Sequence, residues 1–284
     1  MRLLTSVVAA WLVLVGAARA DTILFVGNSF TFGAYSPVWK WRADTVTDLN
    51  GEGIGGVPAL FKRFTEEAGL DYAVSLETHP GIGLDWHVAN AMPKIDRAWD
   101  HVVLQSLSTL DAAKPGDPGK LVESSSVLVR AMRARNSKVD IRLTATWSRA
   151  DLTYKGATPW TGKPIAAMSD DLRKGYDAAA RATPGVAGVI PVGDAWTRAM
   201  RDGVADPDPY DGTAFGQIDL WAFDHYHASA FGYYLEALMV FGAVTGRDPT
   251  SLGKTETAAR ELGFSPTQTE ALQKVASAEL AAKR

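Results

Sequence analysis

The sequence predicts an α/β fold in three layers, with a parallel β-sheet of about five strands between two layers of helices. Short apolar runs that suit buried strands alternate along the chain with longer segments whose apolar residues recur at helical spacing. Such alternation implies parallel strands joined by right-handed helical crossovers, which place helices on both faces of the sheet. No internal repeat or linker interrupts the pattern, so we expect a single domain over residues 21–284.

Five runs are predicted to form the strands. A strand that is buried on both faces reads as a short, continuous apolar run, rich in β-branched residues. The first run, residues 23–26, stops at Gly27, and a glycine there permits a sharp backbone turn at the carboxyl end of the strand. The other four, in order, are residues 72–77, 101–105, 139–144 and 189–191.

Helices are predicted between the strands and at the end of the chain. Three segments have apolar residues at helical spacing, namely residues 57–68, 121–135 and 165–182. Gly69 can end the first of them through a left-handed cap. Residues 266–283 are predicted as a last helix, with Ser265 as its N-cap and Pro266 in its first turn.

Residues 1–20 have the pattern of a signal peptide. Arg2 gives the positive start, residues 3–15 are largely apolar, and an Ala-Arg-Ala sequence ends at Ala20 like a cleavage site. The apolar stretch is shorter than the about 20 residues of a membrane-spanning helix. We expect cleavage near Ala20, a secreted or periplasmic protein, and no membrane association after cleavage. An uncleaved anchor is the alternative.

Composition excludes several kinds of chemistry. The chain has no cysteine, which rules out disulfides, thiolate metal sites and cysteine nucleophiles. Loss of the signal peptide would leave 264 residues with 27 basic and 32 acidic side chains, a net charge of −5. This balance disfavours nucleic acid as a partner, because its binding depends on clustered Lys and Arg. With 46% hydrophobic residues, the chain is long enough to bury one sizeable core.

Two segments near opposite ends of the chain carry candidate catalytic residues. Ser29 stands two positions after Gly27, at the carboxyl end of a predicted strand, where open α/β sheets bind their ligands. A serine hydroxyl needs a nearby base to become a nucleophile. The late segment Asp-His-Tyr-His, residues 224–227, offers His227 as that base and Asp224 to orient it, because Asp and His three positions apart can point the same way.

These segments resemble the SGNH/GDSL hydrolases. The resemblance lies in Gly-Asn-Ser-Phe at residues 27–30 after the first strand, and in Asp-x-x-His at residues 224–227 before a final apolar helix. Phe-Val-Gly-Asn-Ser-Phe-Thr at 25–31, Val-Val-Leu-Gln at 102–105, and Ser229, Gly232 and Tyr234 are similar to a bacterial exported branch of that superfamily. The resemblance implies a flavodoxin-like sheet of order 2-1-3-4-5, a Ser29–His227–Asp224 triad, and no metal or cofactor.

The resemblance also implies an oxyanion hole with three donors. The Ser29 backbone N–H is the first. The second is a glycine after the second strand, where Gly81 and Gly83 are both available and Gly83 is favoured because it stands nearer the next helix. The third family donor is the Asn of Gly-x-Asn-Asp, which this chain lacks. Gln105 is the expected substitute, with Ser106 and Ser108 left open.

A substrate pocket is expected at the same edge of the sheet. Asn28, Trp147 and Trp221 are its possible lining residues. Three loops look enlarged, residues 34–56, 111–119 and 202–220, and such loops usually set substrate choice on a rigid scaffold. Tryptophans in or near them could stack on sugar rings; equally, each could simply cover the core.

The sequence therefore favours an exported serine esterase for small-molecule or glycan esters, with short acyl groups such as acetate on a carbohydrate. One alternative is a metal-dependent phosphoesterase, because His225 and His227 with Asp219, Asp224 or His87 could bind zinc. Another is a glycan-binding protein on a lapsed hydrolase scaffold. In an extended segment only one of His225 and His227 can face Ser29, and the family spacing selects His227.

Overall fold

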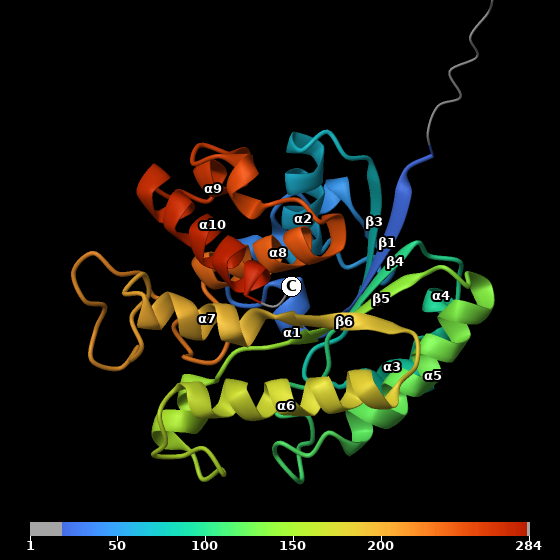
Figure 1. Cartoon of the computed structure of the whole chain (residues 1–284), viewed down its shortest axis with the longest axis horizontal. Coiled ribbons are helices and arrows are strands. Elements are labelled where there is room, and N and C mark those ends of the chain that lie inside the picture. The colour runs from blue at the N-terminus through green and yellow to red at the C-terminus, as the bar shows by residue number, and fades with distance from the viewer. Residues whose placement is uncertain (1–18, 283–284) are drawn as a thin grey trace, which may run out of the picture.

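The computed structural model describes residues 19–282, so residues 1–18 of the predicted signal peptide lie outside the described part. It has one six-stranded parallel sheet in the order β2-β3-β1-β4-β5-β6. Helices cover both faces of this sheet (Figure 1). The strands are β1 (Asp21–Gly27), β2 (Thr47–Asp48), β3 (Tyr72–Thr78), β4 (His101–Leu104), β5 (Asp140–Ala145) and β6 (Val186–Pro191).

The predicted topology is confirmed for the five expected strands. The first strand lies inside the sheet, between β3 and β4, with Phe25 opposite Leu76 on one side and Val103 on the other. The expectation of five strands was one too few. The additional strand β2 has two residues and pairs with β3 at the sheet edge. Two residues are too short to show a period, so the sequence contains no signal for it.

Alternation along β1 divides the core into two parts. Ile23 and Phe25 pack into the core on one face of the sheet, whereas Leu24 and Val26 pack into the core on the other face. Successive side chains of a strand point to opposite faces. The continuous apolar run is therefore explained by burial on both sides, and it places the carboxyl end of β1 in the middle of the molecule.

Two groups of helices pack on the two faces. The face with Phe25 is covered by α2 (Gly56–Glu67), α7 (Val192–Arg201), α8 (Ala230–Thr245), α9 (Thr257–Glu261) and α10 (Pro266–Ala281). The face with Leu24 is covered by α3 (Leu84–Asn90), α4 (Met92–Ile95), α5 (Gly119–Arg135) and α6 (Ala166–Ala182). Short helical turns in the connections are α1 (Ser29–Phe32), η1 (Pro37–Lys40), η2 (Ala43–Thr45), η3 (Asp151–Lys155) and η4 (Pro249–Leu252).

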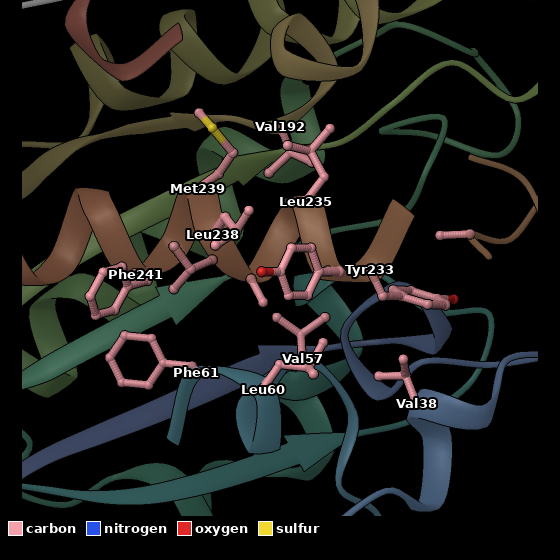
Figure 2. Packing of buried hydrophobic residues seen from close by; sticks show 14 of the residues in the cluster. Val38, Val57, Leu60, Phe61, Val192, Tyr233, Leu235, Leu238, Met239 and Phe241 are labelled. Atoms are coloured by element: carbon pink, nitrogen blue, oxygen red, sulfur yellow. The ribbon is translucent and has the colours of Figure 1, made fainter. Parts of the chain in front are cut away.

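Helix α8 is buried almost all round and fixes the segment that precedes it. It packs against α2, with Val57, Leu60 and Phe61 of α2 on the side of Tyr233 and Phe241 (Figure 2). The ring of Phe64 lies 5.4 Å from that of Tyr234 and 6.0 Å from that of Phe241. The Ser229 side chain caps its first turn. Since α8 begins three residues after His227, its packing anchors the loop that carries this histidine.

The capping residues predicted for two helices, α10 and α2, are confirmed. Ser265 caps α10 in a capping box with Gln268, and Pro266 is in the first turn. Gly69 has a φ of 68° just after α2, in the left-handed region expected of it. Within residues 19–282, no helix is both long and apolar enough to cross a membrane.

Candidate active site

Ser29 lies on a tight turn from strand to helix. Asn28 caps α1, its side-chain oxygen accepting the Phe30 N–H at 3.1 Å. Gly33, at φ 79°, ends α1 after a single turn. Gly27 cannot be replaced without disturbance, since a Cβ there would lie 2.8 Å from the Gln105 Oε1. The turn places Ser29 at the first helical position, 5% exposed, at the carboxyl end of the central strand.

Two buried amide side chains hold this turn against the neighbouring strands. The Asn28 Nδ2 donates to the carbonyl oxygens of Ile82, at 2.8 Å, and Ser106, at 3.1 Å. The Gln105 Oε1 accepts the Asn28 N–H at 2.9 Å and the Thr31 hydroxyl at 3.1 Å. The loops that follow β3, β1 and β4 are thereby tied together behind Ser29.

His227 is held by Asp224 through bonds within one short segment. The Asp224 Oδ2 lies 2.6 Å from the His227 Nδ1, and its Oδ1 accepts the backbone N–H groups of Tyr226, at 3.1 Å, and His227, at 2.9 Å. Because the carboxylate accepts the proton on Nδ1, Nε2 is the ring nitrogen left to act as a base. The spacing of Asp224 and His227 therefore orients the imidazole, as the sequence implied.

Ser29 and His227 line the same cavity, although they come from opposite ends of the chain. The cavity has a volume of about 380 Å³, and its walls are mainly apolar and aromatic. Among residues 19–282, no hydrogen bond joins the Ser29 hydroxyl to the His227 ring. The structure thus brings the two candidate catalytic side chains to one cavity. Their direct hydrogen bond and their roles as nucleophile and base stay predictions.

The pKa values of the Asp224–His227 pair suit a base and its orienting carboxylate. Burial opposes ionisation of Asp224, but hydrogen bonds from His227 and from two backbone N–H groups outweigh it and lower the pKa of the carboxyl. Burial lowers the pKa of His227 below its ordinary value, and the nearby Asp224 offsets this only in part. At neutral pH the imidazole is therefore neutral and can accept a proton.

The predicted oxyanion donors differ in whether they are available at the cavity. The Ser29 backbone N–H has no hydrogen-bond partner in the described part of the chain, so it is available to a ligand. Gly83 is buried next to Ser106, and Gly81, the other choice, lines the cavity instead.

The Gln105 side chain, the expected substitute third donor, is turned inward. It is 1% exposed. The Asn28 N–H can only donate, which assigns Oε1 to that side, and Nε2 donates to the Ser106 carbonyl oxygen. Both the oxygen and the nitrogen of the amide form hydrogen bonds, so this residue supports the turn at residues 27–33, called the serine turn below. Of the open alternatives, the Ser106 hydroxyl accepts the Leu84 N–H and the Ser108 hydroxyl accepts from Arg149. Each hydroxyl keeps its own O–H as a donor, so both residues stay open.

The three possible pocket residues lie outside the cavity lining. Asn28 is buried and uses its side chain in the turn. Trp147 is fully buried between the rings of Phe30, at 4.1 Å, and Trp196, at 4.6 Å. Trp221 is 2% exposed and donates to the Ser148 carbonyl oxygen. Large aromatic rings bury more apolar area in a core than at a rim, and here the core takes both tryptophans.

Loop 34–56, one of the three loops that looked enlarged, contributes five of the eleven residues that line the cavity. Loops 111–119 and 202–220 do not contribute to the lining. Tyr35 and Trp39, which are 56% and 38% exposed, are its most accessible aromatic walls. The Tyr35 ring lies 4.8 Å from that of His227. No sequence signal singled out Tyr35, which has a φ of 59° that is unusual for a residue with a side chain.

The two histidines of the late segment face different surroundings. His225 has a φ of 55° and lies against the Tyr210 ring at 4.2 Å, whereas His227 pairs with Asp224. Within residues 19–282, no group of three or more His, Cys, Asp or Glu side chains is placed to hold a metal ion. The ligand set that a zinc site would need is not brought together there.

The fold is shared with solved structures of low sequence identity. A DUF4886 family protein from Bacteroides uniformis has a TM-score of 0.63 and 18% identity, over 93% of this chain and 95% of that one. A protein described as a GDSL-like lipase, from Parabacteroides merdae, has a TM-score of 0.54 and 16% identity, over 80% of this chain and 96% of that one. No protein-family model and no curated protein matches the sequence. The chain therefore has the SGNH/GDSL hydrolase fold, as the resemblance implied.

Proposed function

We propose that this chain is an exported serine ester hydrolase, with Ser29 as the nucleophile, His227 as the base and Asp224 as its orienting carboxylate. The observation that carries the proposal is the shared cavity. Its wall contains a serine at the carboxyl end of the central strand and a histidine whose far nitrogen is 2.6 Å from a carboxylate. This combination is what acyl transfer to a serine requires.

Each step uses one of these groups. The Ser29 hydroxyl attacks the ester carbonyl carbon while the His227 Nε2 takes its proton, and Asp224 stabilises the imidazolium. When the tetrahedral intermediate collapses, the imidazolium gives that proton to the departing alcohol and leaves an acyl ester on Ser29. Water then attacks the acyl ester with His227 again as base, which releases the acid and restores the serine.

The negative oxygen of the intermediate needs donors that already point to it. The Ser29 N–H is free for this role in the described structure, and Gly81 brings a second backbone segment to the cavity wall. Loss of one such donor costs about 3 to 4 kcal/mol of transition-state stabilisation. We assign the first donor to Ser29.

For the substrate we propose a short acyl ester, such as acetate, on a carbohydrate. A cavity of about 380 Å³ is far larger than an acetyl group, so it has room for part of the alcohol as well. Its walls offer aromatic surfaces, Tyr35 and Trp39, on which the apolar face of a ring can pack. Export from the cell, proposed from the signal-like residues 1–20, would bring the protein to such glycans.

The decisive experiment replaces Ser29. Purified Ser29→Ala should lose hydrolysis of p-nitrophenyl acetate and of acetylated oligosaccharides while it keeps its far-ultraviolet spectrum and melting temperature. Ser137→Ala, at an exposed serine, is the matched control. Activity should withstand a chelator. If Ser29→Ala keeps wild-type turnover and a chelator stops it, the metal-dependent reading replaces the serine mechanism; if wild-type protein binds glycans without any turnover, the lapsed-scaffold reading does.

A further inference from the structure

A buried histidine–glutamate pair lies behind the serine turn and has no part in the mechanism above. His87, in α3, is fully buried, and Glu77, at the end of β3, is 1% exposed. The His87 Nδ1 contacts the Glu77 Oε2, and the His87 Nε2 lies 3.0 Å from the carbonyl oxygen of Gly27. Ionisable side chains are almost never this buried without a partner or a role.

The hydrogen bonds define the state of this pair. A carbonyl oxygen can only accept, so the His87 Nε2 must carry a proton. The other ring nitrogen, Nδ1, faces the Glu77 carboxyl group. The second Glu77 oxygen accepts from Asn50 at 3.3 Å, and Asn50 in turn bonds the Thr78 carbonyl oxygen at 2.7 Å. The imidazole is therefore fixed in position, with its Nε2 proton directed to the Gly27 carbonyl oxygen.

The bond from His87 ends on the peptide that leads into the serine turn. The carbonyl oxygen of the Gly27–Asn28 peptide accepts from the His87 Nε2 and, at 3.2 Å, from the His79 N–H. The N–H of the same peptide donates to the Gln105 Oε1 at 2.9 Å. The plane of this peptide is thus held from both sides, by side chains on α3 and after β4.

We propose that His87, oriented by Glu77, is a positioning residue for catalysis. By holding the Gly27 carbonyl oxygen it fixes the Gly27–Asn28 peptide, and through it the direction of the Ser29 N–H and hydroxyl. This inference rests on the proposed esterase function. His87 is not part of the cavity lining, so it acts through the backbone and not on the substrate.

A purely stabilising role accounts poorly for this choice of residues. Replacing a buried ionic pair by apolar residues of similar volume often leaves stability unchanged or raises it. A core position that served only packing would therefore do as well with leucine or methionine. What an apolar residue cannot supply is the N–H that holds the Gly27 carbonyl oxygen.

The kinetic test compares two ways of changing the pair. The double variant Glu77→Met/His87→Leu removes the donor and leaves no unpaired charge, whereas His87→Gln keeps an N–H within reach of Gly27. We expect the double variant to melt near the wild-type temperature with kcat for p-nitrophenyl acetate about 100-fold lower and KM within about twofold, because small misplacements of catalytic groups have effects of this size. His87→Gln should retain at least a tenth of wild-type kcat.

A transition-state analogue separates positioning from packing. A boronic acid forms a tetrahedral adduct with an active serine, and its Kd should rise in the double variant by about the factor lost in kcat. His101→Gln is the matched control, because His101 pairs with Asp140 at the start of β4, at the opposite end of the sheet from Ser29. Wild-type kcat in the double variant, or losses that follow only the unfolded fraction, would overturn the proposal.

A second readout does not depend on enzyme activity. The chain has four asparagines, so labelling with ¹⁵N-asparagine gives a spectrum with few backbone amides. The Asn28 amide belongs to the held peptide, and its proton shift should move in the double variant but not in His101→Gln. If Ser29→Ala remains active, the esterase proposal fails, but the spectrum still tests whether His87 holds the Gly27–Asn28 peptide. If the Asn28 amide does not move in the double variant, the positioning role of His87 is refuted and the esterase proposal is unaffected.

Discussion

The serine turn (residues 27–33) and the loop that carries His227 (residues 222–229, the histidine loop) meet at one cavity but are held in opposite ways. The turn at Ser29 depends on bonds from distant parts of the chain: Gln105 on the Asn28 N–H, Ile82 and Ser106 on the Asn28 side chain, and the Tyr233 hydroxyl on the Ser29 carbonyl oxygen at 3.2 Å. The loop at His227 is held largely by bonds within itself, such as Asp224 to His227 and the Ala222 N–H to the His227 carbonyl oxygen at 2.7 Å.

Because of this difference, substitutions in the two regions should affect activity and stability differently. Substitutions in the histidine loop should remove activity and leave the fold nearly intact, since few other elements depend on the loop's side chains. Substitutions that leave a buried polar group of the serine turn without any partner, as at Gln105, should cost stability as well. The joint replacement of Glu77 and His87 is different, because the Gly27 carbonyl oxygen still accepts the His79 N–H. The predictions below test that division, starting with the largest effect.

Removal of the base should have the largest effect. His227→Ala should lower kcat for p-nitrophenyl acetate by about 10⁴-fold or more, because the Ser29 hydroxyl then has no proton acceptor. The melting temperature should change little. His225→Ala, two positions away, should stay within about threefold of wild-type kcat; equal losses in the two variants would show that the base has been misassigned.

Asp224→Asn should have the next largest effect. The amide can still accept the two backbone N–H groups but no longer stabilises the imidazolium or favours the tautomer with its proton on Nδ1, so kcat should fall about 10³-fold. Steady-state kinetics on the Asp224→Asn protein measure the fall in kcat, and a thermal melt on the same sample measures any change in stability. A large drop in melting temperature would mean that the loop is not held as locally as the structure indicates.

The pH dependence of kcat/KM should show a single rise with pH. Protonated His227 cannot accept a proton, so below its pKa the rate should fall about tenfold per pH unit. Burial lowers this pKa, so the midpoint should lie below the ordinary value of about 6.5 and activity should persist into mildly acidic solution. Asp224→Asn removes the group that raises the pKa, and its midpoint should shift lower still. A midpoint above 7 would contradict the assignment.

Gln105→Leu should show the opposite signature. It leaves the buried Asn28 N–H without its acceptor and should cost about 1 to 3 kcal/mol of unfolding free energy, which for a chain of this size lowers the melting temperature by about 2 to 4 °C per kcal/mol. A thermal melt measures this directly. A Gln105→Leu protein as stable as wild type would break the contrast between the two regions.

Tyr35→Ala should have the smallest effect and act on binding. Loss of one aromatic wall should raise KM for ring-bearing esters by about three- to tenfold, with little change for ethyl acetate. Phe215→Ala is the matched control, because Phe215 is fully exposed and is not part of the cavity lining. An equal rise in KM for both esters, or in both variants, would mean that Tyr35 does not contact the ring.

Features that depend on neighbouring residues were predicted well. The five main strands and the ends of helices α2 and α10 follow from short apolar runs, capping residues and glycines, because each is decided within a few positions. The order of the strands was implied by the resemblance to a known family, since pairing joins distant parts of the chain. The two-residue strand β2 was missed, since it exists only by pairing with β3. The joint placement of Ser29 and His227 on one cavity needed the resemblance to a known family and could not have come from spacing alone.

The sequence by itself determined which chemical groups are available and how Asp224 presents His227, because that geometry is set within four consecutive residues. Only the tertiary structure decided the environment of the serine. It turned Gln105 and Asn28 inward as supports, buried Trp147 and Trp221 in the core, and placed His87 on the Gly27 carbonyl oxygen. The physical reason is that a buried polar atom must find a partner, and the fold, not the local sequence, decides which one is within reach.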